Sequence, residues 1–335
     1  MSDADWMNQG PELPQTMRAA LLSGYGGPEV LKIADIPLPA YAPHNEVLIE
    51  VKAAGLNPFE AKVRRGWLAG LFPLELPHVL GTDVAGVVVR KGFDVSELEV
   101  GDTVYGLLDP MRQGTYSGYV AAPSYLLRRM PGNLDFAEAA AVPMAACTAW
   151  YGLVTMVGIG PGSRVLVQAA SGGVGAFAVQ IAKAHGAWVA ATCSQANRDY
   201  VHSLGADLVI DYASQSLTEA VGDLDVVLNS VGGETALESY KVLKPGGQLL
   251  IVLRGDMVEL KARHAMMAQY GVTTREIVFS AQPEILDALR PLIETGKIRV
   301  TVEERIALED VVEAHRRLDA GHRRGKLVLD MEQSA

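Results

Sequence analysis

The sequence predicts an α/β protein with two parts, a β-rich part followed by a doubly wound parallel sheet. The chain has 335 residues, a length typical of about two domains. Up to about residue 137, short alternating runs are separated by Gly and Pro turns, which is typical of β structure. From residue 164 onward, continuous apolar strands alternate with helices, and this alternation predicts a parallel sheet covered on both faces.

In the β-rich part, strands are predicted at 47–51 and 85–89, and a Gly-Asp turn at 101–102 introduces another strand at 103–105. Helical sequence spans 136–157. In the second part we expect strands at 164–169, 188–192, 207–210, 225–228, 248–253 and 274–279, with the first helix at 174–185. The helix after residue 233 is expected to stop at the Pro-Gly-Gly of 245–247. An amphipathic helix at 309–320 precedes a last strand at 325–329, which could return to the first domain.

The strongest local signal is the segment Ala-Ser-Gly-Gly-Val-Gly at 170–175, between a predicted strand and a predicted helix. It matches the dinucleotide-binding fingerprint, with Ala at the first position. Gly172 lets the backbone approach a pyrophosphate, and Gly175 allows the helix to pack closely on the strand. The helix N-terminus offers free N–H groups to phosphates. We therefore predict cofactor contacts from Ser171, Gly172, Gly173, Val174 and Gly175, in preference to a turn without a ligand.

The end of the second strand favours NADPH over NADH. NAD sites usually carry Asp or Glu about 20 residues after the fingerprint, where it binds the ribose 2′-hydroxyl. Here Thr192 is followed by Cys193 and Ser194, and no acid is present. Ser194, Asn197 and Arg198 could instead hold a 2′-phosphate. The alternative for Arg198 is a solvated helix residue.

Composition excludes several classes of partner. The net charge of −10 and the pI of about 5.2 argue against nucleic acid and anionic membrane surfaces, both of which need clustered Lys and Arg. No apolar run is long enough to span a membrane. Residues 1–16 have no basic start and no apolar run, so we expect a loose tail and no secretory signal. Two cysteines form no disulfide framework, which favours a cytoplasmic protein.

Several motifs, in order along the chain, carry a resemblance. They are GGPEVL at 26–31, GLNPFEAKVRRG at 55–66, LGTDVAGVV at 80–88, GDTVYG at 101–106, LGADLVIDY at 204–212 and GKLVL at 325–329. With the nucleotide loop among them, the sequence resembles the medium-chain dehydrogenase/reductase superfamily, in its zinc-free quinone oxidoreductase-like (enoyl and alkenal reductase-like) branch. The resemblance extends from about residue 17 to 330. One departure is Glu60, where relatives often carry Asp, and its longer side chain could reshape the cleft floor.

The resemblance implies a discontinuous GroES-like catalytic domain at 17–137 and 298–335. A Rossmann NADP-binding domain at 138–297 is inserted in it, and the active site lies in the cleft between the two. It also implies a homodimer and an NADPH-dependent reductase acting on a small electrophilic substrate, namely an enone, enal or quinone. Two alternatives stay open: an alcohol or ketone dehydrogenase of the same superfamily, and an NADPH-binding structural or trafficking protein with little turnover.

The sequence predicts no metal site. Zinc prefers thiolate and imidazole ligands in tetrahedral geometry. Where zinc-dependent relatives have their first catalytic cysteine, this chain has the region of Asn57, and where they have Gly-His-Glu it has Gly-Thr-Asp at 81–83. His78 is interpreted as structural or cleft-lining. Cys147 is expected to pack as a small buried hydrophobe.

Hydride transfer to an enone would place negative charge on the carbonyl oxygen, which needs hydrogen-bond donors. Asn57 and Lys62 are the candidate donors because their motif lines the cleft in relatives. Tyr116 is a weaker candidate, with Tyr119 beside it. The alternatives are a surface salt bridge with Glu60 for Lys62 and ordinary packing, which we prefer, for the tyrosines.

The resemblance adds further cofactor contacts. Thr148 would contact the nicotinamide side. The turn containing Asn229 and Val231 would pass under the ribose. Leu253 would line the cleft near the nicotinamide, and Tyr212 would be a further cofactor contact.

Overall fold

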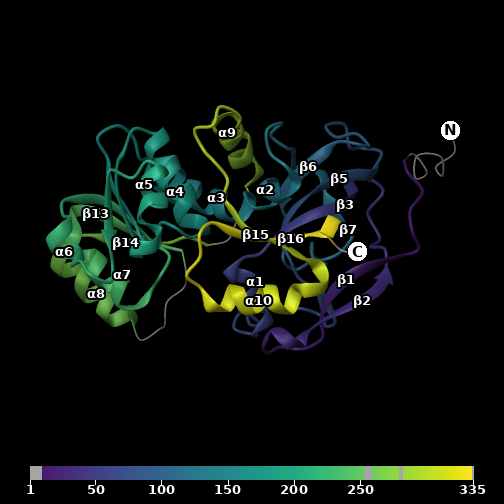
Figure 1. Cartoon of the computed structure of the whole chain (residues 1–335), viewed down its shortest axis with the longest axis horizontal. Coiled ribbons are helices and arrows are strands. Elements are labelled where there is room, and N and C mark those ends of the chain that lie inside the picture. Colours follow the sequence, from purple (N-terminus) through teal and green to yellow (C-terminus); the bar gives the residue numbers. More distant parts are fainter. Residues whose placement is uncertain (1–9, 253–258, 279–281, 334–335) are drawn as a thin grey trace.

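The computed structural model describes residues 10–252, 259–278 and 282–333. It has two domains side by side, with the last strands of the chain crossing back to the first domain (Figure 1). Leu253, a predicted cofactor contact, lies outside the described residues. Among the described residues, no helix is both long and apolar enough to cross a membrane.

The inserted domain is built on a six-stranded parallel sheet with the order β11-β10-β9-β12-β13-β14. Its strands are β9 Arg164–Val167, β10 Trp188–Cys193, β11 Leu208–Asp211, β12 Leu224–Asn229, β13 Leu243–Ile251 and β14 Thr273–Glu276. From β9 the strands continue in sequence order to β10 and β11 on one side, and from β12 they continue to β13 and β14 on the other. The pair β9 and β12 is therefore the switch point, where α/β sheets bind ligands beyond the carboxyl ends of their strands.

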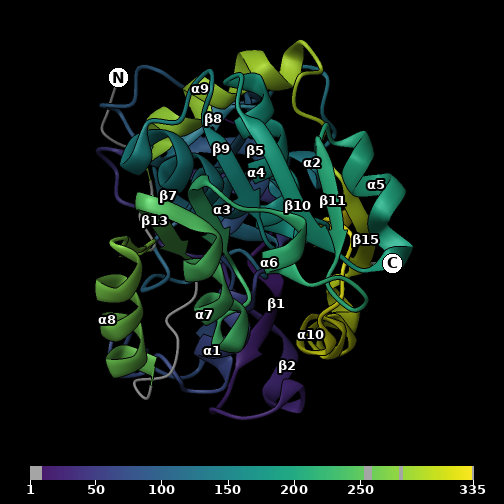
Figure 2. The ribbon, with the colours of Figure 1, turned by 90° about the vertical axis from the view of Figure 1, so that its left-hand side faces the viewer.

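Helices cover both faces of this sheet (Figure 2). They are α4 Gly173–Ala184, α5 Arg198–Ser203, α6 Leu217–Ala220, α7 Gly233–Val242 and α8 Glu259–Tyr270. Because crossovers between parallel strands are right-handed, α4 and α5 lie on one face, and α7 and α8 lie on the other. Two separate apolar cores result, one containing Phe177 of α4 and the other containing Tyr240 of α7.

The catalytic domain contains two sheets. A three-stranded sheet has the order β2-β1-β4, and a seven-stranded sheet has the order β15-β16-β3-β5-β6-β8 with β7 paired to β3. The strands are β1 Thr16–Leu22, β2 Leu31–Pro37, β3 Glu46–Gly55, β4 His78–Val79, β5 Asp83–Lys91, β6 Thr103–Leu107, β7 Tyr119–Pro123, β8 Leu127–Arg129, β15 Val302–Ala307 and β16 Lys326–Asp330. β16 pairs antiparallel with β3, which confirms that the last strand returns to the first domain.

The remaining helices belong to the catalytic domain or lie between the two domains. They are α1 Pro58–Arg64, α2 Phe136–Ala140, α3 Pro143–Trp150, the π-helix η3 Tyr151–Val157, α9 Pro283–Glu294 and α10 Val311–Ala320. Short 3-10 helices are η1 Pro28–Val30, η2 Ser124–Leu126, η4 Gln195–Asn197, η5 Leu308–Asp310 and η6 Met331–Gln333.

Three sequence expectations differ from the structure. The helical stretch of 136–157 is broken before Pro143, because proline has no N–H for the preceding helix and suits the first turn of a new one. The helix after residue 233 ends at Val242, and the Pro-Gly-Gly segment lies within β13. The tail is not loose throughout: the backbone oxygen of Pro11 accepts a hydrogen bond from Arg90, and Leu13 packs against the domain.

Candidate active site

The loop between β9 and α4 has the geometry of a phosphate cradle. A Cβ on Gly175 would lie 2.3 Å from the backbone oxygen of Ala169, so only glycine lets α4 pack this close to the strand. Gly172 is the N-cap of α4, and no side chain caps the helix. The first N–H groups of α4 are therefore left for an acceptor from outside the chain. These features fit a nicotinamide dinucleotide, and Gly172, Gly173, Val174 and Gly175 would hold its pyrophosphate.

Polar groups gather beside this loop, at the end of β10. The side-chain amide of Asn197 lies 3.3 Å from the hydroxyl of Ser171 and 3.3 Å from that of Ser194. Arg198 follows and is exposed. The structure thus brings together Ser171, Ser194 and Asn197, three of the predicted cofactor contacts. Tyr212, at the end of β11, is 54% exposed and makes a backbone contact to Cys193.

Arg324 is a member of this cluster that sequence analysis missed. Its Nε lies 3.2 Å from Asn197 Oδ1, its Nη2 lies 3.3 Å from the backbone oxygen of Ala196, and its guanidinium stacks on Tyr200. It reaches the site because Gly325, the next residue, donates a backbone hydrogen bond of 2.7 Å to Ser171. A residue from the end of the chain therefore completes a site in the inserted domain.

Asn229 and Gln168 hold the switch point between β9 and β12. Asn229 is fully buried, and its Oδ1 accepts hydrogen bonds from the backbone N–H groups of Val231 and Gly232 at 3.0 and 2.7 Å. Its Nδ2 donates to Gln168. This arrangement fixes the turn and leaves Val231 about half exposed. The turn lies beyond the carboxyl end of β12, which is where a ribose between the two halves of the cofactor would pass.

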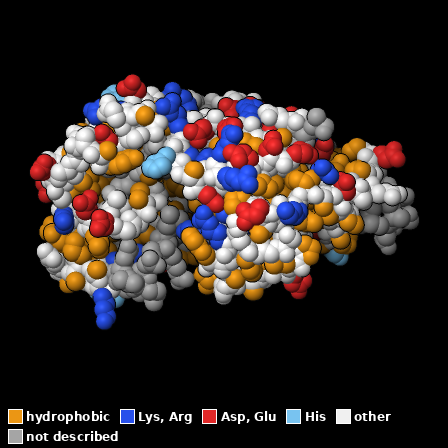
Figure 3. Space-filling model, turned by 60° about the horizontal axis from the view of Figure 1, so that its bottom comes forward, with side chains coloured by type: hydrophobic (Ala, Val, Ile, Leu, Met, Phe, Trp, Pro, Cys, Tyr) orange, Lys and Arg blue, Asp and Glu red, His pale blue; other side chains and the backbone are white. Residues whose placement is uncertain are grey.

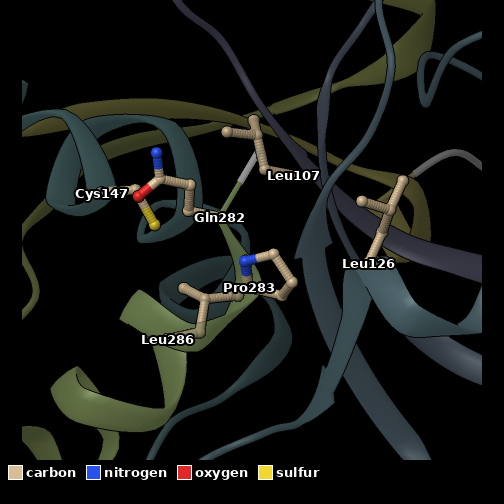
Figure 4. A pocket seen from close by; sticks show the side chains of 6 residues that line it. All are labelled: Leu107, Leu126, Cys147, Gln282, Pro283 and Leu286. Carbon is tan, nitrogen blue, oxygen red and sulfur yellow. The ribbon is translucent and has the colours of Figure 1, made fainter. Parts of the chain in front are cut away.

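Thr148 lies on α3 and lines a small hollow, with room for about one water molecule, together with Tyr151 of η3. The other lining residues are Leu107, Met144, Cys147, Ile277 and Val278. Both domains contribute to this wall, which presents polar and apolar surface in similar amounts. Cys147 also borders a second small apolar pocket beside α9, shown in Figure 4. Cys147 is buried, and burial raises the pKa of its thiol far above the usual value, so it packs as predicted.

A network of buried polar side chains lies in the catalytic domain, around the N-terminus of α1. Glu60 accepts hydrogen bonds from the Thr82 hydroxyl at 2.7 Å and from the backbone N–H of Asn57 at 2.9 Å. Burial, and then the nearby charge of Asp83, raise the pKa of Glu60 to about 7. Burial also raises the pKa of Asp83, although Lys326 opposes this rise. Two buried carboxylates and one ammonium group therefore share this site.

Asn57, the predicted enolate donor, belongs to this network. Its Nδ2 lies 3.1 Å from Asp83 Oδ2 and 3.4 Å from Glu60 Oε1, and its Oδ1 accepts from Lys326. Asn57 is only 3% exposed. Both of its amide hydrogens thus have carboxylate acceptors within the protein, so neither is directed to a substrate in this structure, and the role of Asn57 as an enolate donor stays a prediction.

The two other catalytic candidates have different surroundings. Lys62 is half-buried, and burial lowers the pKa of its ammonium group. The predicted salt bridge with Glu60 is not formed between these two described residues, since the Glu60 carboxylate bonds to Asn57 and Thr82. Tyr116 is fully buried, its ring lies 5.8 Å from that of His315, and its hydroxyl has no hydrogen-bond partner in the described chain. These surroundings are those of a packed side chain, and the catalytic role of Tyr116 stays a prediction.

The described residues contain no group of three or more His, Cys, Asp or Glu side chains arranged to hold a metal ion. His78 is 3% exposed in β4, and burial lowers its pKa.

Two family models match the chain: an alcohol dehydrogenase GroES-like domain at 43–151 and a zinc-binding dehydrogenase domain at 204–329. The mitochondrial NAD(P)H oxidoreductase RTN4IP1 of Danio rerio is 33% identical, with 94% of this chain and 91% of the relative covered. The chain belongs to the medium-chain dehydrogenase/reductase superfamily. The chloroplastic NADPH-dependent alkenal/one oxidoreductase of Arabidopsis thaliana is 36% identical, with 95% of this chain and 80% of the relative covered. Among solved structures, the quinone oxidoreductase of Coxiella burnetii matches with a TM-score of 0.86 and 32% identity, covering 94% of this chain and 99% of that one.

Membership confirms the predicted fold class, a GroES-like catalytic domain joined to a Rossmann domain. The protein is an oxidoreductase that uses a nicotinamide cofactor. On the face shown in Figure 3, Lys and Arg side chains lie interspersed with Asp and Glu side chains over the middle of the molecule.

Proposed function

We propose that this protein is an NADPH-dependent, zinc-independent reductase that delivers hydride to an activated C=C bond or to a quinone. The named relatives include an alkenal/one oxidoreductase, a 2-methylene-furan-3-one reductase and quinone oxidoreductases. Their substrates are already polarised, so their reduction requires less Lewis-acid assistance than alcohol oxidation does. The donor set around Asn57, with amide and hydroxyl groups in place of thiolate and imidazole, supports zinc independence.

The preference for NADPH rests on one observation, the cluster of Ser194, Asn197, Arg198 and Arg324 at the end of β10. A 2′-phosphate needs cationic and hydroxyl donors, whereas a 2′-hydroxyl is normally held by an acid. Arg324 is a planar donor already fixed by Asn197 and Tyr200, so it loses little entropy when a phosphate binds.

In this proposal, reduced nicotinamide supplies the hydride when the cofactor is bound, and the protein supplies position and a proton. Thr148 and Tyr151 line the small hollow between the domains beside which the substrate would lie. Lys62 is the remaining candidate proton donor, because burial lowers its pKa and makes its proton easier to release. The proton goes to the carbon next to the carbonyl of an enone, or to the oxygen of a quinone.

The test compares binding and turnover. Fluorescence titration with NADPH and NADH, followed by a turnover screen of enals, enones and quinones, checks the cofactor and the reaction separately. For Arg324→Ala we expect NADPH affinity to fall about 10- to 100-fold, as for loss of one charge-assisted hydrogen bond, with NADH affinity unchanged. Arg316→Ala removes an equal charge from an exposed ion pair on α10 and is the matched control.

Tighter binding of NADH than NADPH by the natural sequence would refute the cofactor preference. NADPH binding without turnover of any substrate in the screen would instead support a binding-only role. The homodimer and the cytoplasmic location, both suggested by the sequence, are checked by sedimentation equilibrium and by cell fractionation.

A further inference from the structure

Lys326, the first residue of β16, has a buried ammonium group. Its side chain is 5% exposed. Nζ lies 2.8 Å from the backbone oxygen of Leu56 and 3.4 Å from Asp83 Oδ2, and it also donates to Asn57 Oδ1. A lysine buried this deeply needs such partners, because an unpaired charge would be strongly destabilising.

The stem of the same side chain touches the cofactor loop. A Cβ on Gly173 would lie 2.9 Å from Lys326 Cδ, so the lysine stem packs directly against the first residue of α4. The backbone beside it is pinned as well, because Gly325 forms a bridge with Gly172. One end of Lys326 is therefore fixed to the turn that would hold the pyrophosphate.

The other end of Lys326 leads to the helix that carries Thr148. Asp83, which the ammonium group contacts through Oδ2, accepts a hydrogen bond of 2.7 Å from the backbone N–H of Met144 through Oδ1. Met144 lies in the first turn of α3, and Thr148 lies one turn further along the same helix. The contacts therefore run without a break from α4 through Lys326 and Asp83 to α3.

We propose that Lys326 is a positioning residue that sets the separation between the pyrophosphate turn at α4 and the nicotinamide wall at α3. Fixing both ends of the cofactor through one rigid side chain determines where the reactive carbon lies relative to the substrate. A displacement of about 1 Å at such a site can lower a rate about 10²-fold. Neither Lys326 nor Asp83 needs to touch the substrate for this effect. The kinetic part of the inference rests on the proposed reductase function, and the binding part does not.

The decisive variant is Lys326→Met, which keeps most of the stem and removes the ammonium group. We expect kcat to fall about 10²-fold with a smaller change in the KM of the enone. We also expect NADPH to bind at least about tenfold more weakly, while 2′,5′-ADP, which occupies only the adenosine half, binds within about twofold of the natural protein. The matched control is Lys91→Met, which removes a surface ion pair at the end of β5 opposite Asp83.

A purely structural role makes a different prediction. Lys326→Met leaves the Asp83 carboxylate without its cation and could lower stability on that account alone. The double variant Lys326→Met/Asp83→Asn removes both charges, retains an acceptor for Met144, and is compared with Asp83→Asn alone. All of these assays are run at pH 6.5, where Glu60, with a pKa of about 7, is mostly neutral.

Comparing NADPH binding with 2′,5′-ADP binding tests the positioning role of Lys326 even if no substrate is turned over. Persistent loss of NADPH affinity in the double variant, with 2′,5′-ADP unaffected, supports the positioning role. Recovery of both NADPH binding and kcat in the double variant would show that Lys326 only balances charge. Equal loss of both ligands in either variant would show that it merely supports the cofactor domain, and would also overturn the proposal.

Discussion

Glu60 gives the stability of this protein a dependence on pH that can be calculated. Burial, followed by the charge of Asp83, raises the pKa of Glu60 from 4.5 to about 7 in the folded state. The folded protein therefore holds a proton that the unfolded chain releases. Its stabilising effect is fully present below pH 4.5 and is lost as the pH rises through 7. At about 1.4 kcal/mol per pH unit, the complete change amounts to about 3 kcal/mol.

The assay is urea unfolding of the natural protein and of Glu60→Gln between pH 5.5 and 8. The lower limit keeps the protein above its pI of about 5.2, so about 2 kcal/mol of the change is accessible. The natural protein should lose this amount relative to the variant across the range. In the Glu60→Gln variant, the side-chain nitrogen cannot accept the hydrogen bond that the backbone N–H of Asn57 donates. At pH 5.5 the variant should therefore be less stable than the natural protein by about 1 kcal/mol. The two curves should therefore cross.

The groups facing Glu60 are Thr82, Asp83, Lys326 and Tyr116, and none of them is altered by the substitution. Glu46→Gln is the control: burial acts to raise the pKa of Glu46, but hydrogen bonds from Arg112 and Ala42 outweigh it and lower the pKa. The stability that Glu46 contributes is lost only as the pH falls below 4.5, so this control should shift the curve without changing its slope. Parallel curves for the natural protein and Glu60→Gln would refute the reasoning.

Two further predictions concern the cofactor loop and the catalytic domain core. Gly175→Ala places a methyl group 2.3 Å from the Ala169 oxygen, so we expect a loss of about 1–3 kcal/mol in unfolding free energy and weaker NADPH binding. Gly118→Ala, whose new Cβ meets nothing closer than 3.6 Å, is the control in the same urea and titration assays. Tyr116→Phe removes a buried hydroxyl that has no partner in the described chain, so stability and kcat should be unchanged, and a fall in kcat would restore Tyr116 as a proton donor.

The sequence predicts the inserted domain well because its signals are local. Apolar strands and amphipathic helices alternate with a fixed order, and the glycine loop lies between the first strand and its helix as expected. The cluster of Ser171, Ser194 and Asn197 is also predictable, since the carboxyl ends of parallel strands meet at one edge of the sheet. The break before Pro143 could have been predicted from the proline itself.

The contacts that complete the site are long-range and could not be predicted in the same way. Arg324 is 127 residues from Asn197, and Lys326 is 269 residues from Asn57. The GKLVL motif marks Lys326 as a landmark of the resemblance but says nothing about its partners. Asn57 was assigned as a donor because its motif lines the cleft, but the direction of its amide depends on Asp83 and Lys326, which only the tertiary structure brings to it.

The pairing of β16 with β3 has a consequence for how the chain is made. The inserted domain is one continuous segment and can fold while the rest is still being translated. The large catalytic sheet is completed only when β16, near the end of the chain, pairs with residues 53–55 of β3, although residues 46–50 of β3 pair with β7 and can do so earlier. Until β16 is made, the backbone groups of 53–55 lack this partner strand, and an unpaired strand segment invites aggregation. We therefore expect a nascent chain that stops before residue 326 to bind holdase chaperones through its first domain, while its nucleotide-binding half is already protease-resistant.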